Sequence, residues 1–302
     1  MPSTILITGA TGLIGLRLVK FLSQKGSEII AVSQNVMNAQ KILPAVKKII
    51  SWNELDTLKN EKIDAVINLA GTNLDAGRWN SKFKKEIYDS RIESSRKIVG
   101  LIKDMPYKPE VLINASGVDY YGDTGDRDID ENSPHADSFI GNLVNDWEQE
   151  AFKAQQYGAR AVCLRTGFVI ARESKAFKKM VTPYKLFAGG YPGSGKQFIS
   201  WIDIDDLVNI YLFCIENKSL SGRMNATSPN PLRMREFSRI MGKILHRPSF
   251  FPAPAFVLKL LFGEISTLIL SGRKALPGKL SKAGFIFKYP DANDSLSKEL
   301  KN

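Results

Sequence analysis

The stretch "ILITGATGLIG", residues 5–15, decides the fold of this chain. It places Gly9, Gly12 and Gly15 directly after an apolar, β-branched run and at the start of a helical pattern. Glycine lets a backbone turn tightly and approach a pyrophosphate, and a helix N-terminus offers free N–H groups to the phosphates. Three glycines alone are a weak signal, but this strand–loop–helix setting predicts a dinucleotide-binding loop.

Strand and helix patterns alternate outward from this loop. Short apolar runs predict strands at residues 4–9, 28–33, 47–51, 64–71, 110–116 and 159–170. Patterns with helical spacing predict helices at residues 13–26, 78–104 and 137–151. Such alternation with short turns is typical of a parallel sheet covered on both faces. The sequence therefore predicts an α/β fold, a Rossmann-type doubly wound parallel sheet.

The rhythm changes after residue 170. Residues 180–197 have the composition of a loop-rich excursion, and from about residue 226 the chain is helical and punctuated by prolines. In between, the pattern returns to a strand at 198–204 and a helix at 205–217. We expect a dinucleotide-binding domain at residues 1–170, with 198–225 returning to it. A smaller, mostly helical lobe on the substrate side is expected at 171–197 and 226–302.

The composition is that of an ordinary globular protein, with 43% hydrophobic and 24% charged residues. No apolar run reaches the length of a membrane span, and the N-terminus lacks the layout of a signal peptide. Cys163 and Cys214 lack metal-ligand spacing, so we expect reduced thiols, no metal and a cytoplasmic location. The net charge of +11 is spread along the chain, so neither nucleic acid nor a membrane is expected as a partner.

The end of the second predicted strand bears on the choice of cofactor. Proteins that bind NAD place a carboxylate there for the adenosine ribose hydroxyls. This chain has Ser33, Gln34 and Asn35, and no carboxylate before Glu54. Because a carboxylate would repel the 2′-phosphate of NADP, its absence favours NADP over NAD, although neither Ser33 nor Gln34 carries a positive charge.

Motifs spread over the chain resemble those of the extended short-chain dehydrogenases/reductases. In order they are "TGATGLIG", "VINLAG", "NASGVDYYG", "LRTGFVIAR" and "SWIDIDDLV". The stretches "AGRWNSKFKKEIYDSRIESS", "NDWEQEA", "GGYPGSGKQFISWIDIDDLV", "RPSFFPAP" and "GFIFKYP" look like one atypical, epimerase-like branch with a distinctive C-terminal extension. Bacterial members of this branch are often labelled nucleoside-diphosphate-sugar epimerase or cell-division-inhibitor-like. The resemblance covers essentially the whole chain.

The resemblance implies a set of cofactor-binding residues. The glycine loop matches the family pattern fully, whereas Gln34 stands where the family usually has an Arg that binds the 2′-phosphate. The backbone after the fourth strand, two charged residues of the long helix and one residue after "RTG" would also line the cofactor. The implied set is Gly9, Thr11, Gly12, Leu13, Ile14, Gly15, Ser33, Gln34, Leu69, Ala70, Glu86, Arg91 and Val169.

The stretch "DSFIGNLVNDWEQEA", residues 137–151, lacks the Tyr and the Lys four residues later that active members of this superfamily use as proton donor and partner. Alignment through Glu148 places Ile140 and Val144 at those two positions. A catalytic serine matches Ser116, at the carboxyl end of the fifth strand. Tyr121 or Tyr120, within five residues of it, would have to replace the missing acid.

Two hypotheses follow. The first is an NADP-dependent oxidoreductase or epimerase with an atypical site built from Ser116 and Tyr121 or Tyr120, acting on an unknown small molecule. The second is a non-catalytic NADP(H)-binding regulatory or sensor protein. Nucleic-acid binding driven by the charge of +11 is a weaker third hypothesis, since no known module supports it. The sequence does not indicate the substrate or the oligomeric state.

Overall fold

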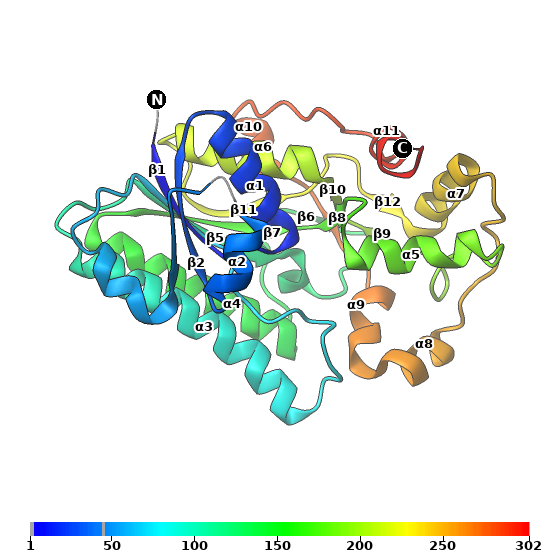
Figure 1. Ribbon diagram of the computed structural model, residues 1–302. Coiled ribbons are helices and arrows are strands. Elements are labelled where there is room, and N and C mark those ends of the chain that lie inside the picture. The colour runs from blue at the N-terminus through cyan, green and yellow to red at the C-terminus, as the bar shows by residue number, and fades with distance from the viewer. Residues whose placement is uncertain (1–2, 44–45, 302) are drawn as a thin grey trace.

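The structure, a computed structural model, describes residues 3–43 and 46–301. Its centre is a seven-stranded sheet in the order β11-β7-β5-β4-β1-β2-β3, with parallel pairing throughout (Figure 1). These strands are β1 Thr4–Thr8, β2 Glu28–Ser33, β3 Lys48–Ser51, β4 Ala65–Asn68, β5 Val111–Gly117, β7 Arg160–Thr166 and β11 Gly222–Ala226. The predicted Rossmann-type parallel sheet is therefore confirmed.

The strand order reverses at β1. The chain first runs outward through β2 and β3, and then returns to the other side of β1 for β4, β5 and β7. In sheets of this kind, ligands bind in the crevice outside the carboxyl ends of the strands at such a reversal. The glycine loop, which follows β1, lies at that point.

Helices cover both faces of the sheet (Figure 1). One face packs against α1 Leu13–Gln24, α6 Ile204–Glu216 and α10 Gly278–Lys282. The other packs against α3 Ser81–Asp104 and the short 3-10 helices η1 Trp52–Leu58 and η3 Lys153–Tyr157. Alternate residues of β1 show why both layers form, since Ile5 and Ile7 join the first core and Leu6 joins the second. Helix α4 Phe139–Phe152 packs beside α3 and β5.

Helix α1 illustrates how the sequence directs this packing. Its buried residues Gly15, Leu18, Val19 and Leu22 recur at helical spacing and turn one stripe toward the sheet. Full burial of a leucine side chain contributes roughly 1.5–3 kcal/mol, and Leu18 and Leu22 are both 0% exposed. The helix gives way to a turn at Gly26, whose φ of 88° is in the left-handed region that glycine adopts readily.

Two predicted elements differ in the structure. The run 159–170, predicted as one strand, is split at Gly167 into β7 and β8 Phe168–Ile170. The Gly167 N–H bonds to the carbonyl of Ala226, and a Cβ at this glycine would lie 2.6 Å from the carbonyl oxygen of Ser200. Strand β8 therefore leaves the sheet and pairs with β10 Trp201–Asp203.

The second difference lies in the excursion predicted to be loop-rich. Helix α5 Lys175–Lys185 occupies its beginning and contains Pro183. Its N-cap is Ser174, whose hydroxyl accepts a hydrogen bond from the N–H of Phe177. Helix α2 Val36–Ile42 and several short elements were also not predicted: η2 Val118–Tyr121, β6 Asp128–Ile129, β12 Leu232–Arg233 and β13 Lys274–Ala275. The strand predicted at 198–204 is divided into β9 Phe198–Ile199 and β10.

The C-terminal part is helical, as expected. Its helices are α7 Met234–Leu245, α8 Ala255–Phe262, η4 Gly263–Ile265, α9 Ser266–Leu270, α10 and α11 Ala292–Lys301. Helices α7 and α11 pack with α5 around Phe177, Tyr184 and Phe237. Across residues 3–43 and 46–301, no helix combines the length and the hydropathy that crossing a bilayer requires. The division into two domains stays a prediction.

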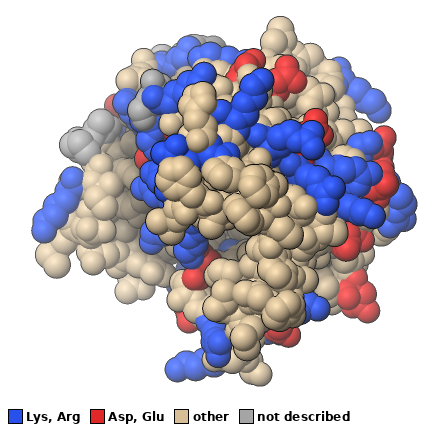
Figure 2. Space-filling view, turned by 90° about the vertical axis from the view of Figure 1, so that its right-hand side faces the viewer, with Lys and Arg blue, Asp and Glu red and all other residues tan. Residues whose placement is uncertain are grey.

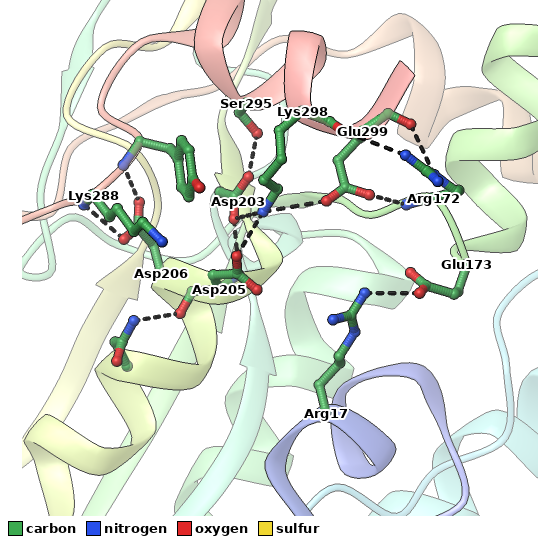
Figure 3. A network of polar contacts seen from close by, with 12 residues as sticks. Arg17, Arg172, Glu173, Asp203, Asp205, Asp206, Lys288, Ser295, Lys298 and Glu299 are labelled. Carbon is green, nitrogen blue, oxygen red and sulfur yellow. Dashed lines mark hydrogen bonds and ion pairs between the residues drawn. The ribbon is translucent and has the colours of Figure 1, made fainter. Parts of the chain in front are cut away.

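A buried polar network joins α11 to the start of α6 (Figure 3). The ammonium of Lys298 lies 2.7 Å from Asp203 and 2.8 Å from Asp205, and the hydroxyl of Ser295 donates to the second oxygen of Asp203 at 2.6 Å. Burial opposes the charge on Lys298, but the hydrogen bonds and charges of Asp203 and Asp205 outweigh it and raise the pKa of Lys298. The last helix is thus tied to the Rossmann core.

We expect Lys298→Met to lower the free energy of unfolding by about 1–3 kcal/mol. The substitution leaves Asp203, which is 0% exposed, without its cation, while the partial exposure of Lys298 limits the loss. Urea denaturation followed by tryptophan fluorescence measures the difference. Lys301→Met, at an exposed position of the same helix, is the control and should change stability by less than about 0.5 kcal/mol. Equal losses in the two variants would contradict this account.

Candidate functional site

The glycine loop has no room for side chains at two of its three glycines. Gly9 has a φ of 66°, and a Cβ there would lie 2.9 Å from the carbonyl carbon and oxygen of Leu69. A Cβ at Gly15 would lie only 2.4 Å from the carbonyl oxygen of Gly9. Gly12 is the N-cap of α1, and its N–H donates to the Gly9 carbonyl at 3.0 Å. The loop is therefore a tight backbone cradle at a helix N-terminus, as the sequence predicts.

Buried polar side chains hold the strand ends beneath this cradle. The hydroxyl of Thr8 donates to the Asn68 side chain at 2.6 Å and accepts the N–H groups of Leu69 and Ala70. The Asn68 amide nitrogen donates to Asn114 at 2.7 Å. These contacts link the carboxyl ends of β1, β4 and β5, so the loops that follow them keep a fixed arrangement.

A cavity of about 1090 Å³ opens beside the loop, lined by residues of four separate segments. Thr11, Gly12 and Leu13 contribute the start of α1, and Ser174 and Lys175 contribute the start of α5. The remaining lining comes from the outer face of α1, the end of α2 and the loop after β4. Two helix N-termini therefore face one cavity, and their free N–H groups and dipoles favour an anion there.

Charged side chains around the cavity add to this preference. Of the two carboxylates in its lining, Glu173 is paired with Arg17 at 2.7 Å (Figure 3) and Asp75 with Lys179 at 2.7 Å. Burial opposes the charge of Arg17, but its contact with Glu173 raises the pKa of the guanidinium. The exposed cations Lys20 and Lys175 also line the cavity. The balance of charge is positive, which suits a pyrophosphate.

Further predicted cofactor residues lie around this cradle. Leu69 and Ala70 contact Gly9, and the next residue, Gly71, lies against the side chain of Arg91. The guanidinium of Arg91 donates to the carbonyls of Thr72 and Ile87, and burial lowers its pKa to about 10. Arg91 is thus a cation that lies beside the loop after β4.

The remaining predicted cofactor residues lie partly at the surface and partly against the core. Glu86 is exposed and accepts a hydrogen bond from the Thr72 hydroxyl at 3.4 Å. Ser33 ends β2, and its hydroxyl bonds to the backbone of Asn35, while Gln34 is exposed. The other members of the predicted set lie nearer the core: Ile14 and Val169 both pack against the core on the α1 side of the sheet. The predicted set therefore divides into a cradle and a more open edge near β2.

The predicted catalytic serine belongs to a buried cluster around Glu148. This carboxylate is 0% exposed and receives two hydrogen bonds from Arg165, both 2.7 Å long. Arg223 donates to it at 2.8 Å, and the hydroxyl of Ser116 donates at 2.6 Å. The hydroxyl of Ser116 is thus engaged with Glu148 on the α4 side of β5. The residue after Ser116 on β5 is Gly117, which carries no side chain.

The two tyrosines continue the same cluster. The hydroxyl of Tyr121 accepts from Arg165 at 2.8 Å and donates to Asn225 at 2.7 Å. The Arg165 guanidinium carbon lies 3.4 Å from the centre of the Tyr120 ring. Burial raises the pKa of Tyr121 to about 12 although Arg165 and Asn225 oppose the shift, so the phenol is a weak acid here. These contacts give Tyr121 a packing role, and its catalytic role stays a prediction.

The positions of the missing Tyr and Lys are part of the core. Ile140 is 8% exposed and Val144 is 4% exposed, and both pack with Val118, Ile129 and Leu143. Neither a phenol nor an ammonium is present on this face of α4 to support proton transfer. A tyrosine that acts as proton donor would therefore have to come from another element.

Tyrosine ionisation provides a test of this packing. Burial raises the pKa values of Tyr88, Tyr121, Tyr184 and Tyr211 above the ordinary value of about 10. Because these folded-state values exceed the unfolded one, the stability they contribute is complete below about pH 10 and is lost as the pH rises toward 12. A tyrosinate absorbance titration should show a late phase together with alkaline unfolding. Ionisation of all nine tyrosines in one step near pH 10 would contradict the prediction.

Several residues of the site were not predicted. Ser174 and Lys175 line the cavity from the start of a helix that was not predicted, and their only signal was a serine before a helical run. Arg17 was within a predicted helix, but nothing in its spacing singled it out. Arg165 and Glu148 pair across 17 positions of sequence, a separation at which no local pattern reveals a contact.

Comparison with known proteins gives consistent results. The sequence model of the NAD dependent epimerase/dehydratase family matches residues 5–226, and that of a domain of unknown function, DUF1731, matches residues 253–299. The chain is 39% identical over 299 residues to the chloroplastic epimerase family protein SDR39U1 homolog of Arabidopsis thaliana, covering 97% of this chain and 85% of that one. It is 35% identical over 294 residues to the epimerase family protein YfhF of Bacillus subtilis, covering 97% and 96%.

Solved structures agree with the sequence matches. The crystal structure of human epimerase family protein SDR39U1 with NADPH superposes with a TM-score of 0.90 and 32% identity, covering 99% of both chains. The nucleoside-diphosphate sugar epimerase of Corynebacterium glutamicum superposes with a TM-score of 0.77 and 28% identity, covering 99% of this chain and 58% of that one. MoeE5 in complex with UDP-glucose and NAD, at 18% identity and a TM-score of 0.77, shares the fold.

Proposed function

This chain belongs to the NAD dependent epimerase/dehydratase family, and from that premise we propose that it binds NADP(H) and acts as an oxidoreductase or epimerase on a small molecule. The observation that carries the proposal is the cavity beside the glycine loop, which two helix N-termini and a positive balance of charge make suitable for a dinucleotide pyrophosphate. The protein would supply binding and orientation, and the nicotinamide would supply the hydride chemistry when bound.

The fit to this cofactor rests on the loop and its surroundings. Because Gly9 and Gly15 carry no Cβ, the loop can pack tightly against Leu69 and Ala10 and hold the N-terminus of α1 where a phosphate can approach its N–H groups. Ser174 and Lys175 offer a second helix N-terminus and an ammonium on the opposite wall. Human SDR39U1, which shares 32% identity, has been crystallised with NADPH. That structure supports NADP as the preferred form.

The preference for NADP over NAD can be tested at one exposed residue. We expect Gln34→Arg to tighten NADPH binding by about tenfold and to leave NADH binding unchanged, because a guanidinium at the end of β2 pairs with the 2′-phosphate. Gln34→Glu should weaken NADPH binding by a similar factor. Titration of nicotinamide fluorescence measures both. Gln156→Arg, an exposed glutamine in η3, adds the same charge elsewhere and serves as the control.

Two outcomes of this titration bear on separate parts of the proposal. A protein that binds none of the four nicotinamide dinucleotides would refute cofactor binding itself. Equal effects of Gln34→Arg on NADPH and NADH would refute only the assignment of the 2′-phosphate to the end of β2.

The catalytic part of the proposal needs a proton donor for a carbonyl or hydroxyl substrate. We propose Tyr121 or Tyr120, with Ser116, as the groups available near the carboxyl end of β5. A second candidate function is a non-catalytic NADP(H)-binding sensor. It is favoured by the bonds that already engage Ser116 and Tyr121 with Glu148 and Arg165.

A substrate screen separates these two functions. Purified protein with bound NADPH is incubated with a panel of aldehydes, ketones and sugar nucleotides while NADPH oxidation is followed. Turnover lost in Tyr120→Phe or Tyr121→Phe, with NADPH affinity unchanged, supports the catalytic function. Turnover that survives in both variants and in Ser116→Ala excludes these donors, and no turnover over the whole panel supports the sensor. A cytoplasmic location, consistent with two buried free thiols, belongs to the same proposal.

A further inference from the structure

Eight large apolar side chains are exposed on one side of the C-terminal part. Four project from α8 and its end, namely Phe256 at 73% exposed, Leu260 at 76%, Leu261 at 61% and Phe262 at 41%. The other four lie at the end of α5 and in the loop after α7, and they are Leu186, Phe187, Phe250 and Phe251, between 48% and 71% exposed. Together these eight residues form the apolar patch.

The segments that carry the apolar patch are linked to one another. The loop after α5 and the loop after α7 are side by side, because the N–H of Phe251 donates to the carbonyl of Gly189. Helix α8 begins four residues after Phe251, and Leu258 is its single buried member. Figure 2 shows this side of the molecule, where uncharged surface fills the centre of the view. Exposed apolar areas of this size usually mark a contact surface.

Basic side chains surround the apolar patch. Helix α7 presents Arg235, Arg239 and Lys243 at intervals of four residues on its exposed side. Arg247 follows the helix, and its guanidinium lies 4.3 Å from the centre of the Phe187 ring. The exposed lysines of α5 and α8 on the same side are Lys178, Lys185 and Lys259. Together with Arg235, Arg239, Lys243 and Arg247 they form the basic band, and lysine and arginine are blue in Figure 2. The chain from Arg247 to Phe262 contains no acidic residue.

We propose that the apolar patch and the basic band dock this protein on the surface of a membrane that carries anionic lipids. Phenylalanine and leucine side chains that project from a short helix and adjacent loops insert at the boundary between headgroups and acyl chains. Lysine and arginine beside them bind the anionic headgroups. The sequence predicted no membrane partner because its basic residues are spread along the chain, but the fold gathers seven of them into the basic band beside the apolar patch. Helix α8, with eight residues, lies on a bilayer without spanning it.

The charge argues against a second copy of the chain as the occupant. Contact between two apolar patches would bring two basic bands against one another, and like charges at short range repel. The net charge of +11 adds to that repulsion. An anionic bilayer offers both an apolar layer and negative charge, which is the combination that the surface matches.

The experiment is co-sedimentation of the full chain with vesicles of phosphatidylcholine alone and of phosphatidylcholine mixed with phosphatidylglycerol. Wild type is expected to sediment with the mixed vesicles and to remain in the supernatant with phosphatidylcholine. The patch variant Phe256→Ser with Leu260→Ser, and the band variant Arg239→Glu with Lys243→Glu, should each lose about tenfold or more in binding. Circular dichroism and thermal melting establish that both variants are folded.

Matched controls lie outside the surface. Ile286→Ser removes an 88% exposed isoleucine elsewhere, and Lys62→Glu with Lys103→Glu reverses two exposed charges elsewhere. Both controls should bind as wild type. Binding to neither vesicle would overturn the proposal, as would a folded patch variant that binds like wild type. A dimer in sedimentation velocity that the patch variant converts to monomer, without vesicle binding, would instead make the surface an interface between copies.

Discussion

Arg165→Met is expected to lower the free energy of unfolding by about 3–5 kcal/mol. The substitution leaves the carboxylate of Glu148, which is 0% exposed, without its two-point partner. It also removes a donor from Tyr121 and the cation that stacks on the Tyr120 ring at 3.4 Å. A buried charge that loses its counter-ion keeps the cost of leaving water but not the attraction that offset it.

Denaturation by urea, followed by tryptophan fluorescence, measures this loss. Arg223→Met is the matched control, because Arg223 is 30% exposed and makes one bond to the same carboxylate, so about 1 kcal/mol is expected. The double substitution Arg165→Met with Glu148→Leu should recover a large part of the stability, since it removes both buried charges. A single Arg165→Met variant as stable as wild type would show that the cluster does not hold the sheet and α4 together.

Gly15→Ala is expected to weaken NADPH binding by about a hundredfold, which corresponds to ~2.8 kcal/mol. The added Cβ would lie 2.4 Å from the carbonyl oxygen of Gly9 and 2.7 Å from the carbonyl carbon of Ala10. These are backbone atoms and cannot rotate away, so the cradle must open and its N–H groups lose their alignment. A parallel stability loss of about 1–3 kcal/mol is expected from the same clash.

Gly100→Ala is the control for this variant. Gly100 lies within α3, and a Cβ there meets nothing within 4 Å. Alanine in a helix interior should raise stability by about 1 kcal/mol and leave NADPH binding unchanged. Titration of nicotinamide fluorescence on the folded variants compares the affinities. An unchanged affinity in Gly15→Ala would remove the glycine loop from the proposed site.

The parts of the fold that neighbouring residues determine could be predicted from the sequence. The strand–loop–helix around Gly9 and the alternation of apolar runs depend on neighbouring residues, and the Rossmann-type sheet follows from them. The break at Gly167 was not predictable, because it arises from contacts with Ser200 and Ala226 far along the chain. Helix α5 was missed because Pro183 suggests a loop, although the proline lies in the last turn of an otherwise regular helix.

The site was predictable to a similar degree. The tight cradle at the start of α1 depends on glycines within one short stretch, so its geometry could be predicted, while its use as a cofactor site stays a prediction. The second helix N-terminus at Ser174 comes from a segment about half the chain away, so only the folded structure brings it to the same cavity. Ser116 was selected by its position at the end of a strand, and Tyr121 by its closeness to Ser116 in sequence. Glu148 and Arg165 determine how the two hydroxyls are used.

The tie between α11 and the segment before α5 has a consequence for the order in which a growing chain becomes able to capture its nucleotide. Glu299 accepts the N–H of Arg172 at 2.6 Å, and the next residue, Glu173, pairs with Arg17 of α1. The wall opposite the glycine loop is thus anchored by a residue that is synthesised 127 positions after Arg172. A nascent chain has its phosphate cradle early, but the opposing wall is secured only after α11 has been synthesised.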